Sequence, residues 1–223
     1  NNPATDGHPD WTFSQGGPTY TLKTLRVLVR PGTTPTGLSL VVASPDPHQV
    51  VQRQPNGMGT VPVAGDLKIP CDRIEARVIP IDLSGADAGD PLPWTLVQDA
   101  PAGANFFGLI DVPTGWYRME VQALDETDAV LDVVHVSPVG VGEVFITAGQ
   151  SNSANSGDPP LTPADPRVSA WGLGGWQHAV DPQPIATGTG GTPWPPLGDL
   201  LAERFGVPIG FLSVGWGGTS VSQ

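Results

Sequence analysis

One stretch decides the fold of the C-terminal part of this chain: Gly142-Glu-Val-Phe-Ile-Thr-Ala-Gly-Gln-Ser-Asn-Ser-Ala-Asn155. Residues 144–147 form an apolar run, which is typical of a central strand of a parallel sheet that is buried on both faces. The strand is expected to end at Gly149, and a polar turn follows it. Because ligands of open α/β sheets bind beyond the carboxyl ends of the strands, this turn is a predicted ligand site.

Ser151 is the residue of this turn with the clearest chemical use. A serine on a glycine-containing turn can present its hydroxyl to a pocket, and Gln150, Asn152 and Asn155 supply hydrogen-bond donors and acceptors for a polar ligand. The same residue types also cap helices and form ordinary turns. Spacing alone therefore leaves open whether Ser151 reacts or caps a following helix.

Downstream of this turn the sequence predicts a strand, a helix and another strand. Residues 168–171 form a short candidate strand, and residues 195–205 form the best helix, since prolines suit its first turn. The apolar residues at helical spacing are Leu197, Leu200, Leu201 and Phe205. Gly206 ends the helix, and residues 207–214 return as a strand. Strand, helix and strand in this order predict the α/β class, with a right-handed crossover.

Upstream, the sequence changes character near Pro138, and residues 1–137 predict an all-β region. Gly, Pro, Asp and Asn separate short runs in which apolar and polar residues alternate, which is typical of an antiparallel β-sandwich. The predicted strands cover residues 21–29, 38–42, 74–81, 116–124 and 130–136. We therefore expect a sandwich of the immunoglobulin or jelly-roll kind over 1–137, followed by an α/β domain over 138–223.

Composition and charge exclude several classes of function. The net charge is −12 and no basic patch is visible, so neither nucleic acid nor an anionic membrane surface is an expected partner. The sequence has no run of about 18 apolar residues, so no membrane span is predicted. A single cysteine, Cys71, excludes an intramolecular disulfide and a multi-cysteine metal site. The chain begins Asn-Asn-Pro, which fits a secreted or periplasmic protein after signal removal, although an artificial boundary looks the same.

A second glycine-rich turn, Ser213-Val-Gly-Trp-Gly-Gly-Thr-Ser220, follows the last predicted strand. Gly217 and Gly218 carry no side chain, so their backbone N–H groups can approach a substrate closely. Two such N–H groups directed at a developing alkoxide form an oxyanion hole. The alternative is a flexible turn without a chemical role. Trp216, between the glycines, is the best candidate for lining a pocket, whereas the other tryptophans are expected in the core or as a sugar-binding platform.

The two blocks together resemble the SGNH hydrolases. The sequence Gly-Glu-Val-Phe-Ile-Thr-Ala-Gly-Gln-Ser-Asn is similar to the first block of the sialate O-acetylesterase and acetylxylan esterase branch, in which Gly-Gln-Ser-Asn carries the nucleophile. Residues 207–220 look like the second block of that branch. The resemblance covers about 140–223, and the β-rich region before it also fits such esterases.

The resemblance implies a fold, a set of site residues and a reaction. The fold would be part of a flavodoxin-like three-layer α/β/α domain. Ser151 would be the nucleophile, its N–H and that of Gly217 or Gly218 would be oxyanion donors, and Gln150 and Asn152 would support the site. An acyl-enzyme would form on an acetylated glycan, with a histidine as base and an aspartate orienting it, and with neither metal nor cofactor.

The later blocks of the family, a Gln-Gly-Glu-type turn and an Asp-x-x-His pair, are missing from this sequence. The four histidines are His8, His48, His135 and His178. None follows the family pattern, and we expect His178 to be structural. Asp158, Asp165, Asp181 and Asp199 are interpreted as loop or helix-surface carboxylates. We therefore expect a second polypeptide or a further segment of chain to supply the catalytic Asp and His. The alternative is a non-catalytic carbohydrate-binding or scaffold protein with a vestigial serine block.

Overall fold

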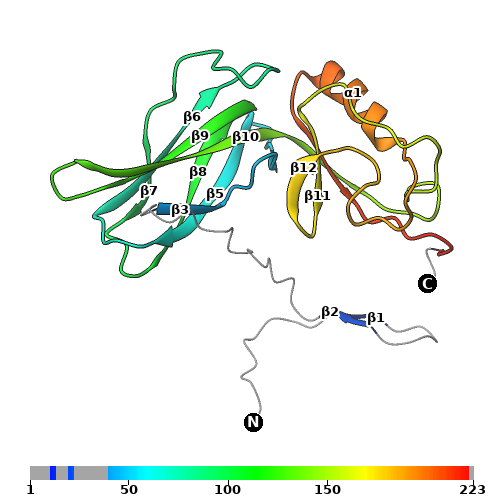
Figure 1. Ribbon diagram of the computed structural model, residues 1–223, viewed down its shortest axis with the longest axis horizontal. Coiled ribbons are helices and arrows are strands. Elements are labelled where there is room, and N and C mark those ends of the chain that lie inside the picture. Colours follow the sequence, from blue (N-terminus) through cyan, green and yellow to red (C-terminus); the bar gives the residue numbers. More distant parts are fainter. Residues whose placement is uncertain (1–10, 14–19, 23–39, 221–223) are drawn as a thin grey trace, which may run out of the picture.

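The computed structural model describes residues 11–13, 20–22 and 40–220, with side chains for the last range. This part consists mostly of β-strands in two main sheets, with one helix (Figure 1), which is compatible with the predicted α/β class. No helix in it is long and apolar enough to cross a membrane. The elements are β1 (Trp11–Phe13), β2 (Tyr20–Leu22), β3 (Leu40–Ser44), β4 (Val50–Gln52), β5 (Met58–Leu67), β6 (Arg73–Pro80), β7 (Thr95–Asp99), β8 (Asn105–Pro113), β9 (Gly115–Leu124), β10 (Val130–Thr147), β11 (Val168–Gly172), β12 (Gly175–His178), α1 (Trp194–Phe205) and β13 (Ile209–Ser213).

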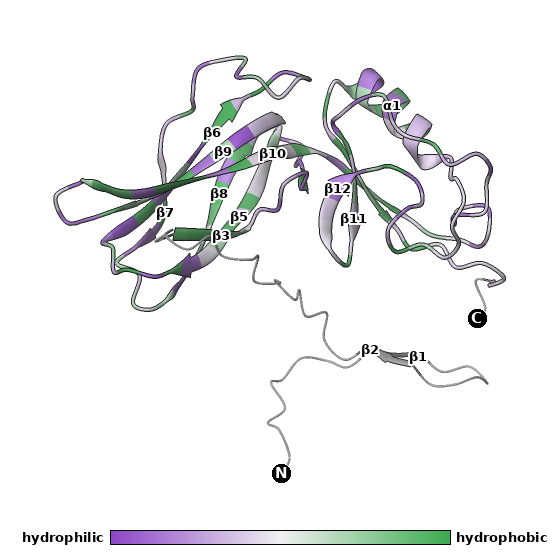
Figure 2. Cartoon of the chain, in the orientation of Figure 1, coloured by the Kyte–Doolittle hydropathy of each residue, from purple (hydrophilic) through white to green (hydrophobic). Residues whose placement is uncertain are grey.

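The larger hydrophobic core lies between the three-stranded sheet β3-β5-β8 and the strands β6, β9 and β10 of the eight-stranded sheet. Burial alternates along β6, as predicted for a strand with one face on a core, and also along β5, which was not among the strands predicted from the sequence. Val61, Ile74 and Met119 are fully buried there. Figure 2 shows hydrophobic residues along β3, β6 and β10. Of the strand predicted over 21–29, residues 23–29 lie outside the described residues.

Strand β10 runs without interruption from this core into the C-terminal part. Its first half pairs with β9 in antiparallel fashion and its second half pairs with β13 in parallel. Pro138 lies inside the strand, at a register shift between Val136 and Val139. A proline is tolerated at such a bulge because it has no N–H to lose from the ladder. The boundary predicted at Pro138 therefore falls within a continuous strand.

The C-terminal part has the predicted strand–helix–strand order. Strands β11, β13 and the end of β10 run parallel, and α1 connects the β11–β12 hairpin to β13. The helix ends at Gly206, which has a left-handed φ of 66° and donates its N–H to Ala202 O. This φ suits glycine, so the predicted stop is confirmed.

The buried face of α1 differs from the predicted leucine stripe. Pro195, Gly198 and Ala202 are buried against the sheet, whereas Leu200 is 63% exposed and Phe205 is 43% exposed. The reason is a close helix–sheet contact. A Cβ atom on Gly198 would lie 2.3 Å from Val168 Cγ1, so only a small residue lets the helix approach this closely.

The strand order also departs from expectation. Numbered by their place in the sequence, the parallel strands are β10 (first), β11 (second) and β13 (third). Strand β13 lies between β11 and β10, so their order across the sheet is second, third, first. A flavodoxin-like sheet places the first strand between the second and the third. Within the described residues no strand pairs with the other edge of residues 143–147, where Val144 N–H donates to Gln52 Oε1 at 2.7 Å. The predicted central strand is therefore an edge strand here, and it is not buried on both faces, because Ile146 is 72% exposed.

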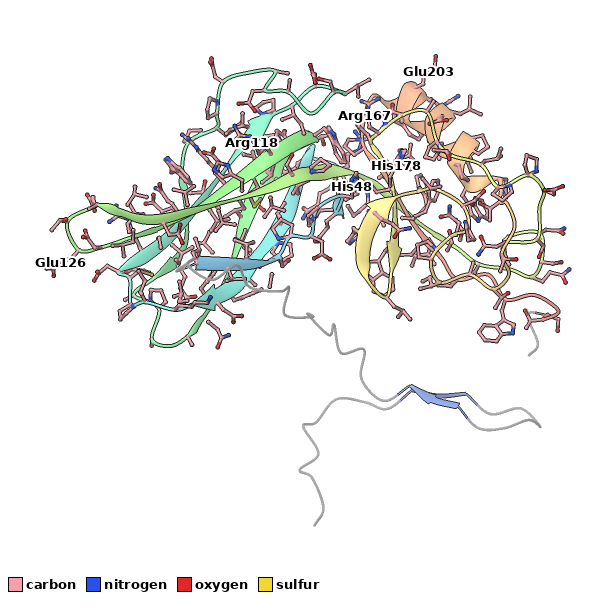
Figure 3. All side chains as sticks on the ribbon, viewed as in Figure 1. His48, Arg118, Glu126, Arg167, His178 and Glu203 are labelled. Atoms are coloured by element: carbon pink, nitrogen blue, oxygen red, sulfur yellow. The ribbon has the colours of Figure 1, made fainter. Side chains whose placement is uncertain are left out.

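Two histidines meet where the larger core adjoins the C-terminal part (Figure 3). The ring of His48 stacks on that of His178, with 6.4 Å between the centroids, and lies 6.3 Å from Trp116. His48 Nδ1 is buried and has no hydrogen-bond partner. Burial and the nearby charge of His178 lower the pKa of His48 below its usual 6.5. On the other side of this contact, Asp46 approaches Gly175, and burial raises the pKa of that carboxyl.

We expect the stability of the chain to fall as the pH is lowered from 6.5. The folded state keeps His48 neutral while the unfolded state takes up a proton, so the free energy of unfolding decreases in that window. Asp46 acts with the opposite sign and at more acidic pH. Urea unfolding between pH 5 and 7.5 measures the effect. His48→Asn, which tolerates the positive φ of 65° at this position, should flatten the profile. An unchanged profile in this variant would contradict the assignment.

Candidate functional site

The two predicted turns begin side by side, because β10 and β13 are neighbouring parallel strands. Thr147 and Ser213, the last residues of these strands, are paired in the register, and Thr147 Oγ1 donates to Ser213 Oγ at 3.0 Å. Both hydroxyls are buried. The carboxyl ends of the two strands therefore deliver the serine turn and the glycine turn to the same edge of the sheet.

Glycines at two positions allow these turns to touch. Trp216 N–H donates to Gly149 O at 2.8 Å. A Cβ on Gly149, which has a φ of 153°, would lie 2.6 Å from Ser153 Oγ, and a Cβ on Gly215 would lie 2.7 Å from Ser153 O. A larger residue at Gly215 would push the two turns apart, and one at Gly149 would displace the Ser153 side chain within the serine turn. The structure thus brings together the two blocks that the sequence singled out.

Ser151 lies in a tight turn and does not cap a helix. Ser153 N–H and Ala154 N–H both donate to Gln150 O, which closes the turn, and no helix begins before Trp194 in the described chain. Ser151 is half-buried, while Gln150 and Asn152 are exposed. The Ser151 hydroxyl makes no hydrogen bond within the described residues, whereas Ser153 Oγ donates to Gln150 O at 3.2 Å.

A pocket of about 590 Å³ opens beside Ser151. Ser151 and Asn152 line it together with residues 156–159, Leu161 and residues 191–193. Gln150, Trp216 and the glycine pair 217–218 do not line this pocket. Trp216 is 63% exposed, and its predicted role in lining a pocket stays a prediction.

The two predicted glycine donors differ in their surroundings. Gly217 N–H donates to Thr187 Oγ1 at 2.7 Å, so it is already engaged. Gly218 N–H has no partner within the described residues, and a φ of 76° favours glycine at that position. Of the two, Gly218 is the N–H group that is available to a ligand.

Thr187, which sequence reasoning missed, ties the two turns together. Its N–H donates to Gly215 O at 3.0 Å, and its carbonyl oxygen accepts Asn155 N–H at 2.9 Å. Together with the bond from Gly217, Thr187 makes three hydrogen bonds to the segments that carry the predicted site. A lone threonine between Ala and Gly has no sequence signal that would single it out.

A buried polar network supports these turns from behind. Asp181 accepts Thr192 N–H at 2.7 Å, Thr192 Oγ1–H at 2.7 Å, Gln183 Nε2–H at 3.0 Å and Leu161 N–H at 3.1 Å. Asn155 bonds both to Gln183 N and O and to Ala186 O. Asp181 lies in a loop, one of the two places expected for it, but it is only 7% exposed and so is not a surface carboxylate. Its burial depends on donors that are distant in sequence.

The other acidic residues and the histidines lie away from Ser151 or on the surface. Asp165 Oδ2 forms an ion pair with Arg167 Nη2 at 2.6 Å. Burial raises the pKa of the Asp165 carboxyl, but hydrogen bonds from the side chain and backbone of Arg167 outweigh this and hold the pKa below 3.8. His178 Nε2 lies 3.2 Å from Asp165 O, and neither histidine of the junction lines the pocket. His135 lies in β10 beside Arg118. His8 is outside the described residues.

The tryptophans with described side chains mostly pack against neighbours. Trp194 Nε1–H donates to Ser153 O at 3.1 Å and its ring packs near Phe211, while Trp116 is buried. The Arg77 guanidinium lies 4.4 Å from the centre of the Trp94 ring. Trp11 lies outside the range of residues whose side chains are described. Within residues 40–220 no three His, Cys, Asp or Glu side chains are grouped to hold a metal ion.

The arrangement places a serine with an unengaged hydroxyl, a glycine turn with an available N–H group and a pocket at one edge of a parallel sheet. No protein-family model and no curated protein sequence matches this chain.

Proposed function

We propose that this chain carries the nucleophile of a secreted or periplasmic serine esterase of the SGNH type, which removes O-acetyl groups from a carbohydrate. One observation carries the proposal: Ser151 follows a parallel strand, borders a pocket and keeps its hydroxyl out of any hydrogen bond within the described residues. A turn serine with a purely structural role would use its hydroxyl, as Ser153 does.

In the proposed reaction Ser151 Oγ attacks the acetyl carbonyl carbon while a general base takes its proton. The N–H groups of Ser151 and Gly218 donate to the oxyanion, and Gln150 and Asn152 support the turn. The base then protonates the departing sugar hydroxyl, which leaves an acetyl ester on Ser151. Water hydrolyses this ester and releases acetate. No step requires a metal or a cofactor.

The base and the aspartate that orients it belong to a second polypeptide or to a further segment of chain. This part of the proposal is supported by the pocket itself, because no histidine of the described chain lines it. The open edge of residues 143–147 and the exposed Ile146 fit a sheet that further strands complete. The proposal includes a β-sandwich accessory domain, supported by the core between the two sheets, and an SGNH domain after it.

A phosphonate inhibitor tests the proposal directly. We expect an aryl phosphonate to label Ser151 in the full-length protein and to abolish hydrolysis of a chromogenic acetate ester in proportion to labelling. Peptide mass spectrometry locates the adduct. An adduct at another residue, or complete labelling with full activity, would refute Ser151 as the nucleophile.

Carbohydrate binding without turnover is the second candidate function. The absence of a histidine from the described wall of the pocket favours it. In that case acetylated oligosaccharides bind the protein, and no ester is hydrolysed under any condition that allows binding.

Thr187 offers a test of the oxyanion turn. Thr187→Val keeps the shape of the side chain but removes the acceptor for Gly217 N–H. We expect kcat for an acetate ester to fall roughly 10-fold with little change in KM, because a loosened turn misplaces the Gly218 donor. Thr187→Ser, which keeps the hydroxyl, should restore most of the rate. An unchanged or higher kcat in the valine variant would show that the turn does not depend on this bond.

A further inference from the structure

Two glycines bring segments of backbone together in the wall of the pocket beside Ser151. Gly157 and Gly191 exchange two hydrogen bonds, of 2.8 and 2.7 Å, across the pocket wall. A Cβ on Gly191 would lie 2.3 Å from Pro159 O, so the two backbone segments can approach this closely only because Gly191 has no side chain. The side chains that line it are polar at Ser151, Asn152, Ser156, Asp158 and Thr192, and apolar at Pro159, Leu161 and Pro193. Such a wall combines hydrogen-bonding groups for sugar hydroxyls with apolar surface.

The charge of the pocket is negative. Asp158 is the one charged residue among those that line it; its side chain is exposed and has no partner within the described residues. Between residues 144 and 220 the sequence has two basic residues other than histidine, Arg167 and Arg204. Arg167 is held by Asp165. Arg204 lies in the last turn of α1, about 16 Å along the helix from the end that borders the pocket.

The start of α1, which borders the pocket at Pro193, is closed to anions. A helix N-terminus normally offers unpaired N–H groups to a negative charge. Here Pro195 and Pro196 have no N–H, and Trp194 N–H donates to Thr192 Oγ1 at 3.3 Å. Leu197 N–H already bonds to Pro193 O. The helix therefore has no N–H group left to hold a carboxylate, and the Asp181 charge lies just behind Thr192.

We infer that this pocket accepts acyl esters of uncharged sugars and that Asp158 makes it reject sugars that carry a carboxylate, such as sialic acids and uronic acids. The Asp158 carboxylate accepts hydrogen bonds from sugar hydroxyls and repels a second carboxylate at the same place. This inference rests on the proposed function, and it assigns Asp158 as the residue that determines specificity.

The test compares wild type, Asp158→Asn and Glu203→Gln in the full-length protein. Glu203 is an exposed carboxylate of α1 outside the pocket, so its variant changes the net charge equally. The substrates are a chromogenic acetate ester, acetylated xylo-oligosaccharides and acetylated oligogalacturonates. Wild type should prefer the neutral saccharide. Asp158→Asn should raise kcat/KM for the anionic one about 3- to 10-fold, with less gain at high salt. Glu203→Gln should show no such gain, and the gain in Asp158→Asn is measured relative to the rate of the same variant on the chromogenic ester.

Equal kcat/KM of wild type for both saccharides, or no gain in Asp158→Asn, would overturn the inference while leaving the esterase proposal intact. If the wild-type protein hydrolysed none of these esters, the chromogenic one included, the proposed function itself would be refuted. Calorimetric binding of the two saccharides to Ser151→Ala and Ser151→Ala/Asp158→Asn then decides the inference without turnover. A preference for the neutral saccharide that Asp158→Asn weakens supports it, and equal affinities contradict it.

Discussion

Replacing Ser151 with alanine is expected to lower kcat for an acetate ester by at least about 10⁴-fold, because the loss of a triad nucleophile leaves only binding and oxyanion stabilisation. The fold should be unaffected. The Ser151 hydroxyl makes no hydrogen bond within the described residues, so the free energy of unfolding should change by less than about 0.5 kcal/mol. Initial rates in the full-length protein and urea unfolding measure the two effects.

Ser156→Ala is the matched control for this experiment. Ser156 lines the same pocket with an exposed side chain, and it is not in the turn that carries the predicted nucleophile. We expect a change of only a few-fold in kcat/KM. A Ser151→Ala protein that retains wild-type turnover, or a Ser156→Ala protein that loses as much activity as Ser151→Ala, would remove the basis for the assignment.

The largest effect on stability is expected at Asp181. In Asp181→Ala, the N–H groups of Thr192 and Leu161, the Thr192 hydroxyl and the Gln183 amide lose their acceptor in a site that is 7% exposed. Buried donors left without partners carry a large desolvation cost, so the free energy of unfolding should fall by about 3 kcal/mol. Urea unfolding at pH 7 measures this loss.

Two further variants make the prediction about Asp181 specific. Asp181→Asn keeps the shape but replaces one acceptor oxygen with an NH₂ group, which faces N–H donors, and it should also lower the free energy of unfolding. Asp158→Asn removes an equal charge from an exposed side chain without a partner and should be neutral within about 0.5 kcal/mol. If Asp181→Ala were as stable as Asp158→Asn, the network would have no structural role.

Local patterns predicted the elements near the candidate site well. The glycine at position 206 stops α1 where expected, since its left-handed conformation is a local property of the backbone. The two glycine-containing turns meet because each follows a parallel strand of one sheet, and the sequence places both at strand ends. The chemical role of Ser151 stays a prediction that the proposed experiments test.

Non-local contacts explain the errors. The leucine stripe of α1 has the correct helical spacing, yet Gly198 and Ala202 face the sheet because small residues permit a closer approach than leucines do. The apolar run at residues 144–147 predicts a strand buried on both faces, but α1 packs on the face that carries Phe145, and Ile146 on the opposite face is exposed. The spacing of apolar residues in the sequence indicates which residues share a face of a helix or strand, but it does not indicate which element packs against that face.

The sequence by itself determined the strand–helix–strand order, the end of α1 at Gly206 and the presence of two polar, glycine-containing turns after strands, since these depend on backbone preferences and on neighbours within a few residues. Only the tertiary structure decided that β10 joins both halves of the chain, that Thr187 holds Gly217, and that Asp181 is buried at the centre of a polar network. These features arise from hydrogen bonds between segments that lie far apart in the sequence, and such pairings become defined only when the sheet brings the segments together.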